Sequence, residues 1–128
     1  MPKGEELDNR ELAMMTGGIL SANKAEDIVV LGIAEQSSFA DFFVNATAMN
    51  ERQMGALADE VEDQLAKEGV IPKNIEGKPS SGWILMDYGD IVVNVFLPGQ
   101  REMYQLEKIW GDGESVRIDG ENLSPKML

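Results

Sequence analysis

Two carboxylates, Asp87 and Asp90, stand three positions apart in the segment DYGD, between two apolar runs. Such a pair could hold a divalent cation, and protein-bound Mg²⁺ commonly shares its ligands with a phosphate substrate. A phosphate substrate would also need a glycine-rich cradle or clustered basic residues, and the chain contains neither G-x-x-x-x-G-K-[ST] nor G-x-G-x-x-G. Because Asp and Gly are ordinary turn residues, we expect no metal site here. A nucleotide- and metal-binding domain is kept as the alternative.

The other polar residues offer little support for nucleophilic catalysis. Ser37 and Ser38 could act as nucleophiles, but the chain has no histidine to activate them, and nothing in the sequence fixes Lys24 beside them. Cysteine is also absent, which removes thiol catalysis, thiolate metal sites and disulfides. We therefore predict a protein without catalytic residues, metal or cofactor, which is not an enzyme.

The apolar runs around DYGD predict a β-hairpin over 83–97, with Tyr88-Gly89 as its two-residue loop. This loop would pair Asp87 with Asp90, and Trp83 with Asn94. Side chains alternate between the faces of a strand, so one face is wholly apolar and is the expected core side. That core face holds Ile84, Met86, Ile91, Val93, Val95 and Leu97. The other face is mixed and holds Trp83, Leu85, Asp87, Asp90, Val92, Asn94 and Phe96.

Two explanations of the mixed face stay open from the residues alone. A helix of the same chain could cover it, as in layered α/β domains. Alternatively, another protein covers it, because a tryptophan with charges nearby is typical of a binding hot spot and large exposed apolar patches usually mark interaction sites.

The hydrophobic pattern as a whole predicts a single α/β domain, a mixed β-sheet packed with helices. The predicted elements are helix 7–23, strand 26–33, strand 42–47, a helix from the N-cap Asn50 to Gly69, strand 73–77, the hairpin, and helix 101–110. Gly17-Gly18 weakens the first helix and could break it, because each glycine costs up to about 1 kcal/mol in a helix interior. We expect the domain to span 1–110 and residues 111–128 to form a flexible acidic tail.

Charge narrows the choice of partner. The chain has 128 residues, 23 of them acidic and 11 basic, and a formal net charge of −12. Lys and Arg, which bind phosphate backbones, are scattered, so we expect no direct sequence-specific binding of nucleic acid. A basic protein partner is favoured instead. No apolar run is long enough for a membrane span, and the acidic N-terminus does not look like a signal peptide, so a cytoplasmic location is expected.

Four segments carry a longer pattern in a fixed order. They are AEDIVVLGI at 25–33, SSFADFFVNATAMNERQMGALADEVEDQL at 37–65, IEG at 75–77 and GWILMDYGDIVVNVFLPGQREMYQLEKIW at 82–110. The string W-x-L-x-D-Y-G-D-x-V-V-x-V-F followed by R-E-x-Y-x-L-E-x-x-W is long and specific. With these segments the chain resembles the Iojap-like ribosomal silencing factors (RsfS) over residues 7–110, nearly the whole predicted domain.

The resemblance implies a nucleotidyltransferase-like fold without the catalytic residues. It also implies a translation regulator that binds the large ribosomal subunit, on the protein conventionally numbered fourteenth, and sterically blocks joining of the small subunit. Ribosomal proteins are basic and this chain is acidic, so the implied partner agrees with the charge. The resemblance therefore favours the second explanation of the mixed face, in which another protein covers it. A third hypothesis is a domain that pairs with its own copy when free.

The resemblance extends to the residues expected to bind the partner. They are Trp83, Leu85, Asp87, Tyr88, Asp90, Asn94 and Glu76. Trp83 and Leu85 would supply buried area, and Asp87 and Asp90 would face Lys or Arg of the partner. Glu76, the acid of the IEG segment, would add to an acidic rim.

Two of these residues have a second interpretation or depart from the family pattern. Tyr88 is explained equally well as an aromatic side chain packed in the turn. Asn94 stands where many members of the family carry histidine; it can still form hydrogen bonds, but any pH-linked role of that position is lost.

Overall fold

A seven-stranded mixed sheet organises the described part of the chain. The computed structural model describes residues 8–33, 40–99, 115–118 and 125–127. The strands are β1 (Glu26–Gly32), β2 (Phe42–Thr47), β3 (Asn74–Lys78), β4 (Trp83–Asp87), β5 (Ile91–Phe96), β6 (Ser115–Ile118) and β7 (Pro125–Met127). Their order across the sheet is β3-β4-β5-β2-β1-β6-β7, and β2 and β5 are parallel. The other neighbouring pairs are antiparallel, so the predicted mixed α/β sheet is confirmed.

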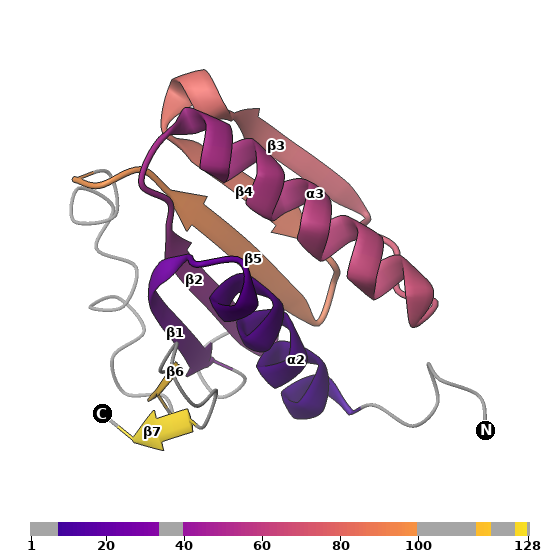
Figure 1. The fold of residues 1–128 in the computed structure, drawn as a ribbon. Helices are drawn as coiled ribbons and strands as arrows, with labels where there is room; N and C mark the ends of the chain where they lie inside the picture. The colour runs from indigo at the N-terminus through magenta and orange to yellow at the C-terminus, as the bar shows by residue number, and fades with distance from the viewer. Residues whose placement is uncertain (1–7, 34–39, 100–114, 119–124, 128) are drawn as a thin grey trace.

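Both described α-helices lie on the same face of this sheet (Figure 1). The first, α2 (Asn9–Ala22), begins at the N-cap Asp8, whose carboxylate accepts a 2.8 Å hydrogen bond from the backbone N–H of Glu11. The side chain of Glu11 accepts in return from the backbone N–H of Asp8, which completes a capping box. The helix runs unbroken through Gly17-Gly18 with Gly17 buried, so the expected break does not occur.

The second helix, α3 (Glu51–Lys67), follows the predicted pattern. Asn50 is its N-cap, and its Oδ1 accepts a 2.8 Å hydrogen bond from the N–H of Gln53. The Gln53 side chain accepts from Met49 N–H and donates to the carbonyl oxygen of Lys24, which ties the start of α3 to the end of α2. The buried stripe of α3 is Met54, Leu57, Val61 and Leu65. In the part of the chain that the structure describes, no helix combines the length and apolar character needed to cross a membrane.

The hairpin places its residues on the predicted faces but in a different register. Tyr88 N–H donates a 2.9 Å hydrogen bond to the carbonyl of Ile91, so the loop is Gly89-Asp90 instead of Tyr88-Gly89. Asp87 therefore pairs with Val92, and the predicted pairing of Asp87 with Asp90 was wrong, as was that of Trp83 with Asn94. The shift is two residues, which preserves the face of every side chain because the strand period is two.

Each face of the sheet has its own apolar cluster. Ile84, Met86, Ile91, Val93 and Val95 pack under the helices, as expected for the core side. A smaller cluster on the opposite face consists of Leu31, Ile33, Ala40, Phe43 and Val92, with Leu85 packed against it.

Some expectations fall at or beyond the limits of the described residues. The predicted helix at 101–110 and most of the loop before β2 lie outside them. Within 111–128, expected as a flexible tail, the described residues are two strands: β6 pairs with β1, and β7 with β6. The division of the chain at residue 110 stays a prediction.

Candidate functional site

The accessible part of the mixed face lies on β3 and β4. Trp83, Leu85 and Asp87 alternate along β4, and each is half-buried. Glu76 on the edge strand β3 is exposed and pairs with Leu85 in the register. We call these four residues the Trp83 face. Both described helices lie on the opposite side of the sheet (Figure 1), so neither of them covers this face.

Two successive hydrogen bonds connect the Trp83 indole to buried side chains of the sheet. Its Nε1–H donates a 2.9 Å hydrogen bond to Oδ1 of Asn94 on β5. The Nδ2 of Asn94 donates in turn to Oδ1 of Asn45 on β2, over 3.0 Å. The indole also stacks on Phe96, with ring centroids 5.5 Å apart and an interplanar angle of 21°. Because Asn45, Asn94 and Phe96 are buried, the orientation of the half-exposed Trp83 is set from inside the sheet.

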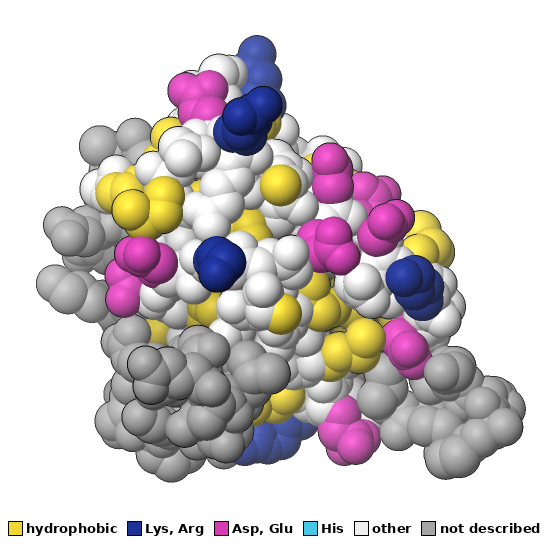
Figure 2. Space-filling model, viewed as in Figure 1, with side chains coloured by type: hydrophobic (Ala, Val, Ile, Leu, Met, Phe, Trp, Pro, Cys, Tyr) yellow, Lys and Arg dark blue, Asp and Glu magenta, His cyan; other side chains and the backbone are white. Residues whose placement is uncertain are grey.

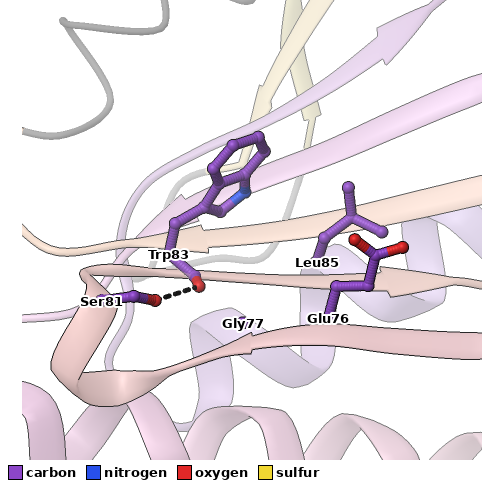
Figure 3. A pocket seen from close by; sticks show the side chains of 5 residues that line it. All are labelled: Glu76, Gly77, Ser81, Trp83 and Leu85. Carbon is purple, nitrogen blue, oxygen red and sulfur yellow. Dashed lines mark hydrogen bonds between the residues drawn. The ribbon is translucent and has the colours of Figure 1, made fainter.

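A pocket of about 240 Å³ opens beside this indole (Figure 3), lined by Glu76, Gly77, Ser81, Trp83 and Leu85. Ser81, in the short helix η1 (Pro79–Ser81), donates through Oγ to the carbonyl oxygens of Lys78 and Trp83. Gly77 has a φ of +86°, and a Cβ atom there would overlap the carbonyl oxygen of Trp83. The pocket therefore depends on the local backbone of β3 as well as on side chains.

The two acids of DYGD lie at the other end of β4. Asp87 is four residues from Trp83, about 13 Å along an extended strand. Its Oδ1 accepts a 2.8 Å hydrogen bond from Gly89 N–H, a local turn interaction, and Asp90 is exposed in the loop. Lys73 reaches over the same loop, since a Cβ on Gly89 would lie 3.1 Å from its Nζ. Among the described residues, no group of three or more His, Cys, Asp or Glu side chains could hold a metal ion.

Two of the residues predicted to bind the partner are buried. Asn94 is 1% exposed and reaches the Trp83 face only through its hydrogen bond to the indole. Tyr88, 9% exposed, packs in the cluster under the helices, on the opposite side from Trp83. Burial, and secondarily the charge of Glu62, raises the pKa of Tyr88 to about 12. Tyr88 therefore matches its second interpretation, an aromatic side chain packed at the turn.

Sequence reasoning missed Asn45, Gly77, Ser81 and Lys73 as parts of this region. Asn45 lies 49 positions from Asn94, and only the parallel pairing of β2 with β5 brings the two together. Its one available signal was a polar residue in the middle of the apolar strand FFVNAT. Gly77 could have been noticed as a glycine within a predicted strand, which often marks a bulge or a close backbone approach.

Charge is distributed over both sides of the molecule. Figure 2 shows acidic side chains gathered along α3, on the side that bears the helices. The exposed acids of α3 are Glu51, Asp59, Glu62 and Asp63. None of the exposed large hydrophobic side chains among the described residues lies on α3, since these are Met49, Ile71 and Ile75. Among the described residues, the Trp83 face therefore presents carboxylates together with an aromatic side chain. The exposed surface of α3 presents carboxylates without an exposed large hydrophobic side chain.

These features define a small α/β domain with a half-exposed tryptophan and carboxylates on one face of its sheet. Residues 6–127 match the family model described as "Ribosomal silencing factor during starvation". The chain therefore belongs to the RsfS family of ribosomal silencing factors, as the sequence motifs indicated.

Individual relatives agree with the family assignment. The chain is 36% identical to the ribosomal silencing factor RsfS of Halalkalibacterium halodurans, over 89% of this chain and 97% of that protein. It is 32% identical to the chloroplastic protein Iojap of Arabidopsis thaliana, over 94% of this chain and 50% of that protein. A crystal structure of a Chromobacterium violaceum protein superposes with a TM-score of 0.78 at 34% identity, covering 82% of this chain and 88% of the other.

Proposed function

We propose that this chain silences ribosomes by docking its Trp83 face on a basic protein of the large subunit, the one numbered fourteenth, and so blocking the small subunit sterically. The observation that carries the proposal is the half-exposed Trp83, oriented by Asn94 and flanked by Glu76. Aromatic side chains fixed in this way are typical of the residues that dominate binding energy. Because the indole is already ordered, little side-chain entropy is lost on binding.

Charge supports a basic partner and a role in recognition. A net charge of −12 steers a positively charged surface toward the domain and speeds encounter. The acids of α3 contribute to this general field, whereas Glu76 and Asp87 lie next to apolar contact area. The Trp83 face therefore offers both the buried area and the local charge that a specific interface needs.

The mechanism needs no turnover. One bound domain occupies the surface required for subunit joining, with no catalytic residue or cofactor, and the proposal places the protein in the cytoplasm, where ribosomes work. The alternative, a nucleotide- and metal-binding domain, has no observation in its favour among the described residues. Pairing with a second copy in the free state stays a separate expectation, which sedimentation equilibrium over a range of protein concentrations would check.

A subunit-joining assay tests the proposal directly. Purified protein is added to separated small and large subunits, and the yield of joined ribosomes is measured on a sucrose gradient. The expected result is a dose-dependent fall in joined ribosomes, with the protein migrating with the large subunit. Unchanged joining at saturating protein would contradict the proposal.

Variants locate the surface. Trp83→Ala should weaken large-subunit binding by about 2 kcal/mol or more, roughly 30-fold, as for a hot-spot residue. The matched control is Met49→Ala, which removes another large apolar side chain, 55% exposed, from outside this face. Equal affinities of the two variants would place the interface elsewhere, provided that circular dichroism shows both to be folded.

A further inference from the structure

The pocket beside Trp83 is lined by apolar side chains, a carboxylate and a hydroxyl group. The half-buried indole of Trp83 and the side chain of Leu85 supply apolar surface. Glu76 brings a carboxylate to the same opening (Figure 3). Its Oε2 accepts a 2.6 Å hydrogen bond from Nδ2 of Asn74. Ser81 adds a hydroxyl group at the side nearest the backbone of Trp83.

We infer that this pocket receives one arginine side chain of the ribosomal protein partner. The inference rests on the proposed function, because it names the group on the partner that fills the pocket. An arginine matches each wall: its methylene stem can cover Leu85, and its guanidinium plane can lie against the indole while it donates to the carboxylate of Glu76. The net charge of −12 makes a cationic occupant the complementary one.

Lysine matches the same walls less well. Its ammonium is a compact, strongly hydrated charge, whereas the guanidinium is planar, more weakly hydrated and able to donate two parallel hydrogen bonds to a carboxylate. The pocket has one flat aromatic wall and one carboxylate, which favours a planar group with several donors. Lys78 pairs with Trp83 along the strand and is not one of the residues that line the pocket.

The first test uses a small probe, so that it does not depend on the ribosome. Nα-acetyl-arginine amide is titrated into the full ¹⁵N-labelled chain, and the indole N–H resonance of Trp83 is followed by NMR, with Trp83→Phe used only to assign it. The expected result is a saturable shift with the arginine derivative and none with Nα-acetyl-citrulline amide, the neutral analogue of nearly the same shape. The lysine derivative should bind more weakly than the arginine derivative.

The second test changes the carboxylate. Glu76→Gln should weaken binding of the arginine derivative about two- to fivefold, as for an exposed ion pair. It should weaken large-subunit binding about tenfold, because the partner excludes water from the pocket. Glu62→Gln, an exposed Glu on α3 on the other side of the sheet, is the matched control and should change neither affinity.

The outcomes separate this inference from the proposed function. Equal shifts with citrulline and arginine derivatives, equal binding of the lysine derivative, or unchanged binding in Glu76→Gln would each overturn the arginine pocket. The proposed function would stand in those cases if the wild-type chain still lowers the yield of joined ribosomes. A chain that binds the arginine derivative but leaves subunit joining unchanged would overturn the proposed function and, with it, the assignment of the arginine to a ribosomal protein.

Discussion

The indole Nε1 of Trp83 donates a 2.9 Å hydrogen bond to Oδ1 of Asn94, a residue that is 1% exposed. A half-exposed aromatic side chain is thus oriented by a buried amide on the neighbouring strand, and that amide donates to Asn45 one strand further on. Burying two amides in a sheet is costly unless they are hydrogen-bonded. Their presence here is explained by the orientation that they impose on Trp83.

Asn94→Ala should therefore affect both stability and binding. It removes the acceptor for Trp83 and the donor to Asn45, which should lower the free energy of unfolding by about 1–3 kcal/mol. Large-subunit binding should weaken as well, because the indole loses its fixed orientation. Urea denaturation and co-sedimentation with large subunits measure the two effects.

Asn94→His is the informative companion to this variant. A neutral imidazole has one acceptor and one donor, so near pH 8 it can accept from the Trp83 indole and donate to Asn45. A protonated imidazole has two donors and cannot accept from Trp83, so binding should weaken below about pH 6.5 in this variant but not in the wild-type chain. Identical pH profiles for the two proteins would contradict a positioning role for residue 94.

Charge at the hairpin loop is the subject of a second prediction. Asp87→Lys with Asp90→Lys should weaken large-subunit binding about tenfold or more at low salt, and the effect should shrink as salt is added. The control is Glu62→Lys with Asp63→Lys on α3, which changes the net charge equally on the other side of the sheet. Surface plasmon resonance at several salt concentrations measures the association rates. A similar loss of large-subunit binding in both double variants would show that the net charge of the domain, and not the position of Asp87 and Asp90, determines the effect.

The predictable part of this fold is the part governed by local periodicity. The strand at 42–47 and the helix capped by Asn50 were found from the sequence because a short apolar run and the 3.6-residue stripe are local signals. The two faces of the hairpin were also correct. The register was not, because Tyr88-Gly89 and Gly89-Asp90 both contain the glycine that the loop needs and both leave the faces unchanged.

The candidate site was predictable only in outline. Trp83, Leu85, Asp87 and Glu76 share one face because of strand alternation, and the motif resemblance singled them out. The buried state of Asn94 and its link to Asn45 depend on strand order, which no local pattern encodes. The position of Lys73 over the hairpin loop is likewise a contact between distant elements.

Tyr88 gives a third prediction, at alkaline pH. Burial and the charge of Glu62 raise its pKa to about 12, above the ordinary value of 10.0. The folded state therefore keeps a proton that the unfolded state has lost, so this contribution to stability is complete below pH 10 and is lost as the pH rises to about 12. Tyr88→Phe should remove this dependence, which urea denaturation between pH 9 and 12 measures against the wild-type chain.

The same variant tests the packing of Tyr88 at neutral pH. Its hydroxyl group is buried and has no hydrogen-bond partner among the described residues. Removing it should leave the free energy of unfolding at pH 7 unchanged or raise it by about 1 kcal/mol. Ribosome binding should be unaffected, because Tyr88 packs on the side of the sheet away from Trp83. A loss of binding in a stable Tyr88→Phe protein would contradict that assignment.

The backbone of β3 gives the last prediction. Gly77 and Gly69 have similar positive φ angles, +86° and +81°, so alanine at either position is strained by about 1–2 kcal/mol. A Cβ at Gly69 meets no atom within 4 Å, whereas one at Gly77 overlaps the carbonyl oxygen of Trp83. Gly77→Ala should therefore cost about 1–3 kcal/mol more than Gly69→Ala, as steric overlap adds to the same strain.

Hydrogen exchange shows where that additional cost appears. In Gly77→Ala the amides that pair β3 with β4 should exchange faster, and the pocket lined by Glu76 and Trp83 should lose its shape, since β3 must move away from β4. Large-subunit binding should fall in this variant and stay unchanged in Gly69→Ala. Equal losses of stability in the two variants would show that β3 relieves the overlap at no additional cost, and that the close approach of Gly77 to Trp83 does not maintain the Trp83 face.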